Sequence, residues 1–279
     1  MKQLVRMLDY LGPYKKSMIA GAALVFIETC FELVIPVLMA DIIDIGVARH
    51  DVSFIMNKGI QMGICAVLSL ITGLLYARYA ARASYGLGAR IREAQYEKVQ
   101  KYSFANLDHF DTSSLVTRMT TDVTVIQNSI NGGLRPMVRG PVMLILGIGL
   151  SIWMNAKLAI VFLISTPILA CILFFIVHKV APMYGVLQKA VDKLNNVVQE
   201  GLTAIYAVKA FVRGEYEEEK FNNVNNDLMV TGQKTFHYAV LNVPAFQFTM
   251  YTAIVLIMWF GGNMIISDKL QVGELTGFL

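Results

Sequence analysis

Several uninterrupted apolar stretches, each long enough to cross a lipid bilayer, dominate this sequence. A helix of about 20 apolar residues spans the roughly 30 Å hydrocarbon core of a membrane. Of the 279 residues, 56% are hydrophobic and 16% are charged, which is too apolar for a water-soluble chain of this length. Five stretches have the required length: 18–40, 61–80, 137–154, 158–177 and 239–262.

Lys and Arg residues alternate between the intervals that separate these stretches. They are numerous before the first stretch, between the second and third, and between the fourth and fifth, whereas the other intervals hold one or two each. The positive-inside rule places the basic intervals in the cytoplasm. We therefore predict a multi-pass membrane protein with a cytoplasmic N-terminus. The net charge of +4 gives no indication of nucleic-acid binding.

The sequence offers no pattern for a metal site or for catalysis. Cys30, Cys65 and Cys171 lie far apart inside apolar stretches and lack the spacing of zinc ligands. No GxxxxGK[ST] phosphate-binding loop occurs, so the chain alone has no ATPase site. We expect no catalytic residue, no metal and no cofactor on this chain.

The two long basic intervals keep a helix-forming, amphipathic composition, and no proline lies between Pro36 and Pro136 or between Pro182 and Pro244. A helix running from 61 to about 101 would be roughly 60 Å long, about twice the hydrocarbon thickness. Cap-forming residues at 103–114 predict one reversal, and Gly214 within 212–219 is the breaker expected in a second. The sequence thus predicts two long helical hairpins whose tips lie deep in the cytoplasm. Residues 1–16 predict an amphipathic helix on the membrane surface.

Both predicted tips carry motifs of a known family. FANLDHFDTSSLVTRMTTDVTVIQ (104–127) resembles the first coupling helix and the following span of ABC exporters, and LNNVVQEGLTAIYAVKAFVRGEYEEEKF (194–221) is similar to the second. ELVIPVLMADIIDIG (32–46) also looks like the first span of bacterial multidrug exporters. The resemblance covers the whole chain, although Tyr206 stands where the family often has an arginine.

This resemblance implies an all-α, six-helix transmembrane bundle with long cytoplasmic extensions, here five complete spans and the start of the sixth at 273–278. Residues 1–16 would form the elbow helix, 104–112 the first coupling helix and 212–219 the second. The residues expected to couple the chain to an ATPase domain are Leu107, Asp108, His109, Phe110, Asp111, Arg213, Gly214 and Tyr216.

The implied function is export of amphipathic drugs, lipids or peptides across a bacterial plasma membrane by alternating access. The implied partners are membrane lipid, an identical or related second subunit, and nucleotide-binding domains that hold ATP and Mg. Those domains are absent from this sequence. Because five crossings leave Leu279 near the outer face, we expect the natural protein to continue through a sixth span, which would make this chain a fragment.

Four charged residues lie inside predicted spans, where an ion needs a partner or water. Glu28 and Glu32 are one helical turn apart in the first span, and Arg135 and Arg139 repeat that spacing in the third. Glu32 and Arg139 both lie roughly 20 Å from the outer end of their span, and Glu28 and Arg135 both roughly 27 Å. Two hypotheses follow: ion pairs that fix packing, or glutamates that line the substrate pathway and attract cations.

Three other interpretations stay open at this stage. A channel or regulatory subunit could use the same scaffold, with ATP acting only as a regulator. A secondary transporter could use the buried glutamates for proton coupling, which predicts tip-free loops in place of helical hairpins. The chain could also be a non-functional gene fragment.

Overall fold

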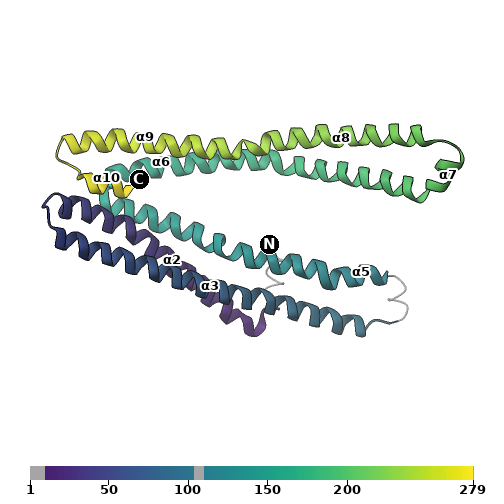
Figure 1. Cartoon of the computed structure of the whole chain (residues 1–279), viewed down its shortest axis with the longest axis horizontal. Coiled ribbons are helices and arrows are strands. Elements are labelled where there is room, and N and C mark those ends of the chain that lie inside the picture. Colours follow the sequence, from purple (N-terminus) through teal and green to yellow (C-terminus); the bar gives the residue numbers. More distant parts are fainter. Residues whose placement is uncertain (1–9, 104–109, 279) are drawn as a thin grey trace. The chain divides into compact units, whose positions relative to one another are not determined.

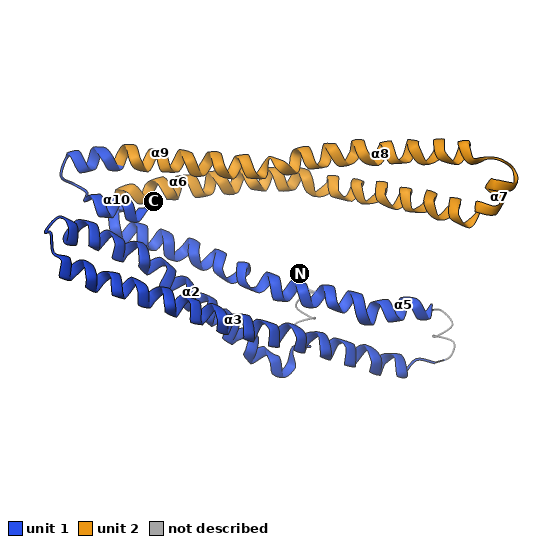
Figure 2. Ribbon diagram, viewed as in Figure 1, with its two compact units in different colours: residues 1–156, 261–279 blue, residues 157–260 orange. Residues whose placement is uncertain are grey.

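The computed structural model describes residues 10–103 and 110–278, and every regular element within these ranges is a helix (Figure 1). The prediction of an all-α membrane protein is confirmed. The chain divides into two compact units (Figure 2). Unit 1 ends its first part at Ala156 and resumes at Gly261, and unit 2 comprises Lys157–Phe260.

Unit 1 contains the first three predicted spans and the start of the sixth. Its elements are η1 (Gly12–Tyr14), α2 (Lys15–Asp41), the π-helical η2 (Ile42–Val47), α3 (Val52–Gln100), α5 (Thr112–Thr117), the π-helical η3 (Arg118–Asp122), α6 (Val123–Thr203) as far as residue 156, and α10 (Val272–Phe278). Residues 1–9 of the predicted elbow helix lie outside the described residues. Residues 10–16 form a turn, η1 and the first two residues of α2.

The second span continues beyond the membrane as one unbroken helix. α3 begins where the Asp51 side chain accepts a hydrogen bond of 3.0 Å from the backbone N–H of Phe54. It then runs for 49 residues, or about 73 Å at 1.5 Å per residue. Since the hydrocarbon core is only about 30 Å thick, more than half of α3 lies outside it. The predicted extension of this span is therefore confirmed.

The extended part of α3 packs tightly because two glycines admit neighbouring segments. A Cβ at Gly86 would lie 2.6 Å from the ring of Tyr14, and a Cβ at Gly88 would lie 2.4 Å from Oε1 of Gln127. The buried residues Leu11, Leu87, Ile91 and Val123 form the apolar cluster at this level. The glycines thus bring the chain before α2 and the start of α6 into direct contact with α3.

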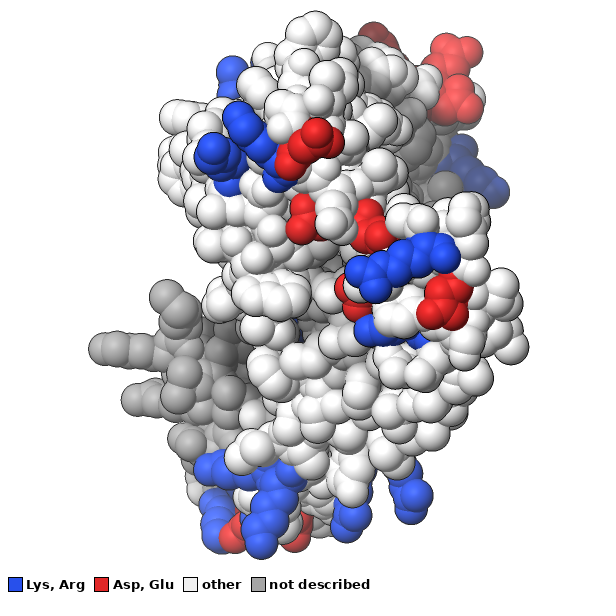
Figure 3. All heavy atoms as spheres, turned by 90° about the vertical axis from the view of Figure 1, so that its left-hand side faces the viewer, with Lys and Arg blue, Asp and Glu red and all other residues white. Residues whose placement is uncertain are grey.

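The start of the sixth helix is fixed to the C-terminal end of the first. Oδ1 of Asp44, in η2, accepts a 2.5 Å hydrogen bond from the backbone N–H of Gly273, and its Oδ2 accepts one of 2.9 Å from Glu274. A Cβ at Gly273 would lie 2.3 Å from the carbonyl oxygen of Ala40, so this contact requires glycine. Figure 3, which faces this end, shows acidic and basic side chains interspersed over a mostly uncharged surface.

Unit 2 contains the fourth and fifth predicted spans. Its elements are α6 from Lys157 to Thr203, α7 (Ile205–Ala210), α8 (Gly214–Val240) and α9 (Asn242–Ile266) as far as Phe260. α6 as a whole carries two predicted spans, because its backbone leaves helical geometry at Asn155, with φ −156° and ψ 107°. Within the described ranges, four helical stretches are long and apolar enough to cross a membrane. With the break at Asn155 they account for the five predicted spans.

The chain reversal between α6 and α8 differs from the prediction. The short helix is α7 (Ile205–Ala210), whereas residues 214–219 of the predicted 212–219 helix form the first turns of α8. The backbone N–H of Arg213 bonds to the carbonyl of Val208 at 2.9 Å, and Val212 takes the left-handed φ of 53°. This is the hydrogen bonding that ends a helix at a left-handed residue. Gly214 is therefore not the breaker; it is the first residue of α8.

Candidate substrate pathway and coupling tips

The four membrane charges of unit 1 form two ion pairs between α2 and α6. Nη2 of Arg135 lies 2.5 Å from Oε1 of Glu28, and Nη2 of Arg139 lies 2.7 Å from Oε2 of Glu32. The pairing is the one that the matched depths predict. Which of the two roles the pairs have stays a prediction, because pairing alone is compatible with packing and with a charged pathway.

In the inner pair, Glu28 and Arg135, the glutamate is buried among three helices. The Glu28 side chain is 6% exposed and that of Arg135 is 43% exposed. Gly73 of α3 makes room for the carboxylate, since a Cβ there would lie 3.1 Å from Oε1 of Glu28. The guanidinium carbon of Arg135 lies 5.9 Å from the ring centroid of Tyr76, whose hydroxyl reaches the carbonyl of Asn131 at 3.4 Å. This pair therefore connects α2, α3 and α6.

In the outer pair, Glu32 and Arg139, the glutamate is more accessible than Glu28. The side chains of this pair are 27% and 39% exposed, so both groups retain contact with the surroundings. Ionised groups at this depth are costly unless they face a partner or water. The two pairs therefore differ in character: the inner glutamate is enclosed by protein, and the outer one is reachable from outside the helix bundle.

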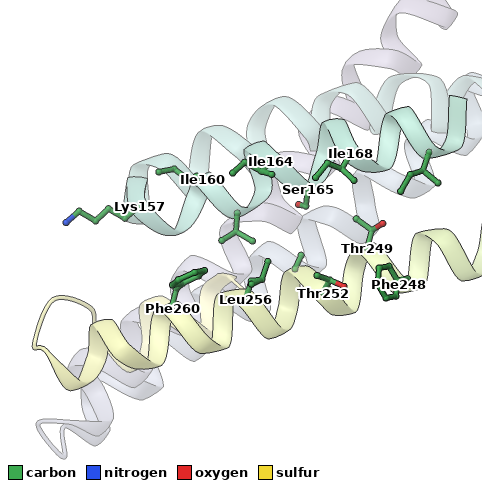
Figure 4. Close-up of a pocket in the computed structure, with 13 residues that line it drawn as sticks. Lys157, Ile160, Ile164, Ser165, Ile168, Phe248, Thr249, Thr252, Leu256 and Phe260 are labelled. Carbon is green, nitrogen blue, oxygen red and sulfur yellow. The ribbon is translucent and has the colours of Figure 1, made fainter. Parts of the chain in front are cut away.

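Unit 2 contains an apolar cavity of about 560 Å³ between α6 and α9 (Figure 4). Ile160, Ile164 and Ile168 line it from α6, and Leu256 and Phe260 line it from α9. The hydroxyls of Ser165 and Thr249 on its wall donate to carbonyls of their own helices, at 3.5 and 2.9 Å. The wall thus offers mainly dispersion contacts, which suits an apolar group of unspecified shape.

The first tip is built around Phe110. Its ring stacks on that of Tyr102 with centroids 5.8 Å apart, and the guanidinium of Arg118 lies 5.8 Å from its centroid. Asp111 accepts a hydrogen bond from the Ser113 hydroxyl just before α5 begins. Leu107, Asp108 and His109, predicted to contact an ATPase domain, lie outside the described residues. Phe110 is half-buried and contacts Tyr102 and Arg118, so only part of its ring is available to a partner.

An arginine fork fixes the hairpin behind this tip. Arg92 of α3 donates from Nε to the carbonyl of Met119 at 3.1 Å, and from Nη2 to Gln127 at 2.8 Å and to Thr124 at 3.2 Å. Met119 lies in η3, where the π-helical turn displaces the regular backbone hydrogen bonds. Arg92 thus holds the irregular turn against α3. Sequence analysis did not identify this residue, because its role depends on the π-helical turn.

The second tip exposes a group of large apolar side chains. Tyr206 is 88% exposed, Phe211 78% and Val212 88%, and the charged run 213–220 follows them directly in the chain. Of the predicted coupling residues, Arg213 stacks over the ring of Tyr216 at 5.6 Å, and Gly214 begins α8. An exposed apolar patch with a polar surround is typical of a protein interface. The sequence prediction missed Tyr206 and Phe211, because it placed the second tip at 212–219.

Ion pairs hold the two helices of the second hairpin together. Nζ of Lys220 on α8 lies 2.8 Å from Oε2 of Glu200 on α6, and Lys193 pairs with Asp227 at 3.5 Å. The hydrogen bond to Glu200, with the charges of Glu200 and Glu217, raises the pKa of Lys220 above its ordinary value. In the described part of the chain, no group of three or more His, Cys, Asp or Glu side chains could hold a metal ion.

The comparisons with known proteins agree with this architecture. The family model described as ABC transporter transmembrane region matches residues 18–279. An uncharacterized ABC transporter ATP-binding protein of Bacillus subtilis, YfiB, is 35% identical over 98% of this chain and 48% of its own length. An ATP-dependent lipid A-core flippase of Desulfotalea psychrophila is 22% identical over 100% of this chain and 49% of its own length. The chain spans about half the length of the curated relatives it matches.

We predict that the inner ion pair stabilises the fold more than the outer pair. Replacing Arg135 by Ala leaves the buried Glu28 side chain without its partner, which costs about 3 kcal/mol, whereas replacing Glu28 by Ala leaves the partly exposed Arg135 unpaired and should cost less. The double replacement should cost less than the sum of the two. The same cycle at Glu32 and Arg139 should give a coupling energy of at most about 1 kcal/mol. Unfolding in mixed micelles measures both cycles. Additive losses at Glu28 and Arg135 would contradict the prediction.

Proposed function

Because the chain belongs to the family of ABC transporter transmembrane regions, we propose that it is the membrane part of an ATP-driven exporter of amphipathic molecules. The observation that carries the proposal is the second tip, where Tyr206, Phe211 and Val212 are exposed. This tip lies at the end of a hairpin whose helices continue beyond their apolar stretches. An apolar patch at this position needs a protein partner, and an ATPase domain is the partner that the family provides. ATP and Mg would bind there, not on this chain.

The coupling surfaces are the two tips, on this proposal. Phe110 and Asp111 contribute to the first, together with Leu107, Asp108 and His109 of the undescribed segment. Tyr206, Phe211, Arg213 and Tyr216 form the second. Long helices transmit a displacement at the tip because their backbone hydrogen bonds make them stiff, and Arg92 couples the first tip to α3 and α6.

A second subunit and lipid complete the assembly, on this proposal. In each span of the described residues, at most 22% of the most apolar window is buried within the chain. The remaining apolar surface requires cover by lipid or by another polypeptide. An identical or related second chain would therefore pack against these spans in a bacterial plasma membrane, with the N-terminus in the cytoplasm.

The substrate pathway is proposed to involve the outer pair of unit 1, Glu32 and Arg139. The accessible carboxylate of Glu32 can attract a cationic group. Glu28, which is buried beside Arg135, has the position of a packing contact. The proposed substrates are amphipathic drugs, lipids or peptides.

The coupling proposal predicts that Phe211→Ser separates ATP hydrolysis from transport. In the complete transporter, transport per ATP hydrolysed should fall at least about fivefold, the loss expected for one interface aromatic worth about 1 kcal/mol. Transport and ATPase assays in proteoliposomes measure both rates. Tyr96→Ser, which also removes an exposed aromatic from an extended helix, is the matched control and should change neither rate. Unchanged coupling in Phe211→Ser would contradict the proposal.

The pathway proposal predicts a charge-dependent effect of Glu32→Gln. This variant removes the negative charge while keeping the side-chain shape, so export of cationic dyes should fall several-fold more than export of neutral dyes. Dye efflux from proteoliposomes at matched protein density measures the ratio. An equal loss for both dye classes would assign Glu32 to packing alone.

A further inference from the structure

Unit 2 has a second hollow, and its lining is basic. The basic groove, with a volume of about 640 Å³, lies between Lys179, Met183 and Val186 of α6 and Thr231, Lys234 and Tyr238 of α8. It is separate from the apolar cavity, whose lining begins at Lys157 and ends at Ile172 on α6. Neither the coupling tips nor the substrate pathway proposed above uses any residue of this groove.

The groove carries positive charge that the described part of the chain leaves uncompensated. Lys179 and Lys234 are both exposed, and neither forms an ion pair with any described residue. The Lys179 ammonium lies 4.9 Å from the ring centroid of Tyr238, which holds it at the groove. No carboxylate lines the groove. The acidic residue nearest in sequence to Lys234, Asp227, pairs with Lys193 instead.

Each of the two lysines lies at the end of a membrane span, and both ends are on the same side of the membrane. Lys179 follows the uncharged stretch 158–177, and Lys234 and Tyr238 precede the stretch 239–262, which is also uncharged. Lysine and tyrosine at the ends of spans are typical of the headgroup level of a bilayer, where a tyrosine ring has apolar and polar surroundings. By the positive-inside rule this level belongs to the cytoplasmic leaflet.

Apolar side chains continue from the groove toward the centre of the membrane. Phe175 is one helical turn before Lys179 and is 71% exposed, and Leu241 is one turn after Tyr238 and is also exposed. Met183 and Val186 line the groove on the other side of the lysines. A molecule with an anionic head and apolar chains would therefore meet lysines at its head and exposed apolar surface along its chains.

We infer that the basic groove binds an anionic phospholipid of the cytoplasmic leaflet, with Lys179 and Lys234 contacting its phosphate. The charge complementarity and the position at the end of both spans identify the ligand, because basic pockets between transmembrane helices on the cytoplasmic side favour anionic headgroups. The inference requires only that the chain spans a membrane. Its outcome is therefore independent of whether the complete protein is an exporter.

Native mass spectrometry of the purified 279-residue chain in detergent tests the inference by lipid titration. Phosphatidylglycerol should bind more tightly than phosphatidylcholine with the same acyl chains. Lys179→Gln and Lys234→Gln should each weaken phosphatidylglycerol binding roughly fivefold, the effect of about one basic residue near a headgroup, and should leave phosphatidylcholine binding unchanged. Both lysines are exposed, and circular dichroism will verify that helix content is retained.

Two further variants distinguish lipid binding in the groove from general electrostatic attraction between the chain and anionic lipid. The double variant Lys189→Gln with Lys209→Gln removes two charges, one more than either groove variant, from exposed positions of unit 2 outside the groove, and it should bind phosphatidylglycerol like the wild type. Val186→Trp fills the groove while keeping both lysines, and it should weaken binding by a similar factor to the lysine variants. Equal affinity for the two lipids, or an equal loss in the control variant, would overturn the inference.

Discussion

Peptide N–H and C=O groups cannot be left unpaired in hydrocarbon, and this constraint determines most of the structure. Each apolar stretch must be helical over the full thickness of the bilayer, because only an intrahelical partner is available to every backbone group. Once formed, α3 meets neither proline nor a terminating cap at the membrane boundary, so it continues to Gln100. The hairpins are thus extensions of the spans, and a displacement at a tip is carried by the helix that crosses the membrane.

The low dielectric of the hydrocarbon core also limits where charged side chains can lie. The buried Glu28 side chain lies among α2, α3 and α6 with Arg135 beside it, whereas Glu32 and Arg139 remain partly exposed. At the ends of the spans charged groups are not paired within the protein in the same way, since Lys179 and Lys234 remain exposed and no carboxylate lines their groove. Protein partners thus neutralise charge inside the membrane, and lipid is available to do so at its surface.

Much of this could be predicted from the sequence. The spans followed from the lengths of apolar stretches, and both ion pairs followed from equal depths on two helices, because helical rise is constant. The second tip was misplaced, since Gly214 is the stronger local breaker, whereas in the structure α7 ends at Ala210 and Val212 takes the left-handed φ of 53°. The role of Arg92 was not predictable either. It depends on the π-helical turn at Arg118–Asp122 and on a contact between α3 and α6, neither of which has a sequence signal.

The central claim is that the hairpin tips lie in the cytoplasm while the turn between the first two spans lies outside. Single cysteines at positions 49 and 206, in a chain lacking Cys30, Cys65 and Cys171, test it through labelling by a membrane-impermeant maleimide. The account predicts that position 206 reacts in inverted vesicles but not in intact cells, and that position 49 shows the reverse. Reaction of position 206 in intact cells, or of both positions from the same side, would contradict it.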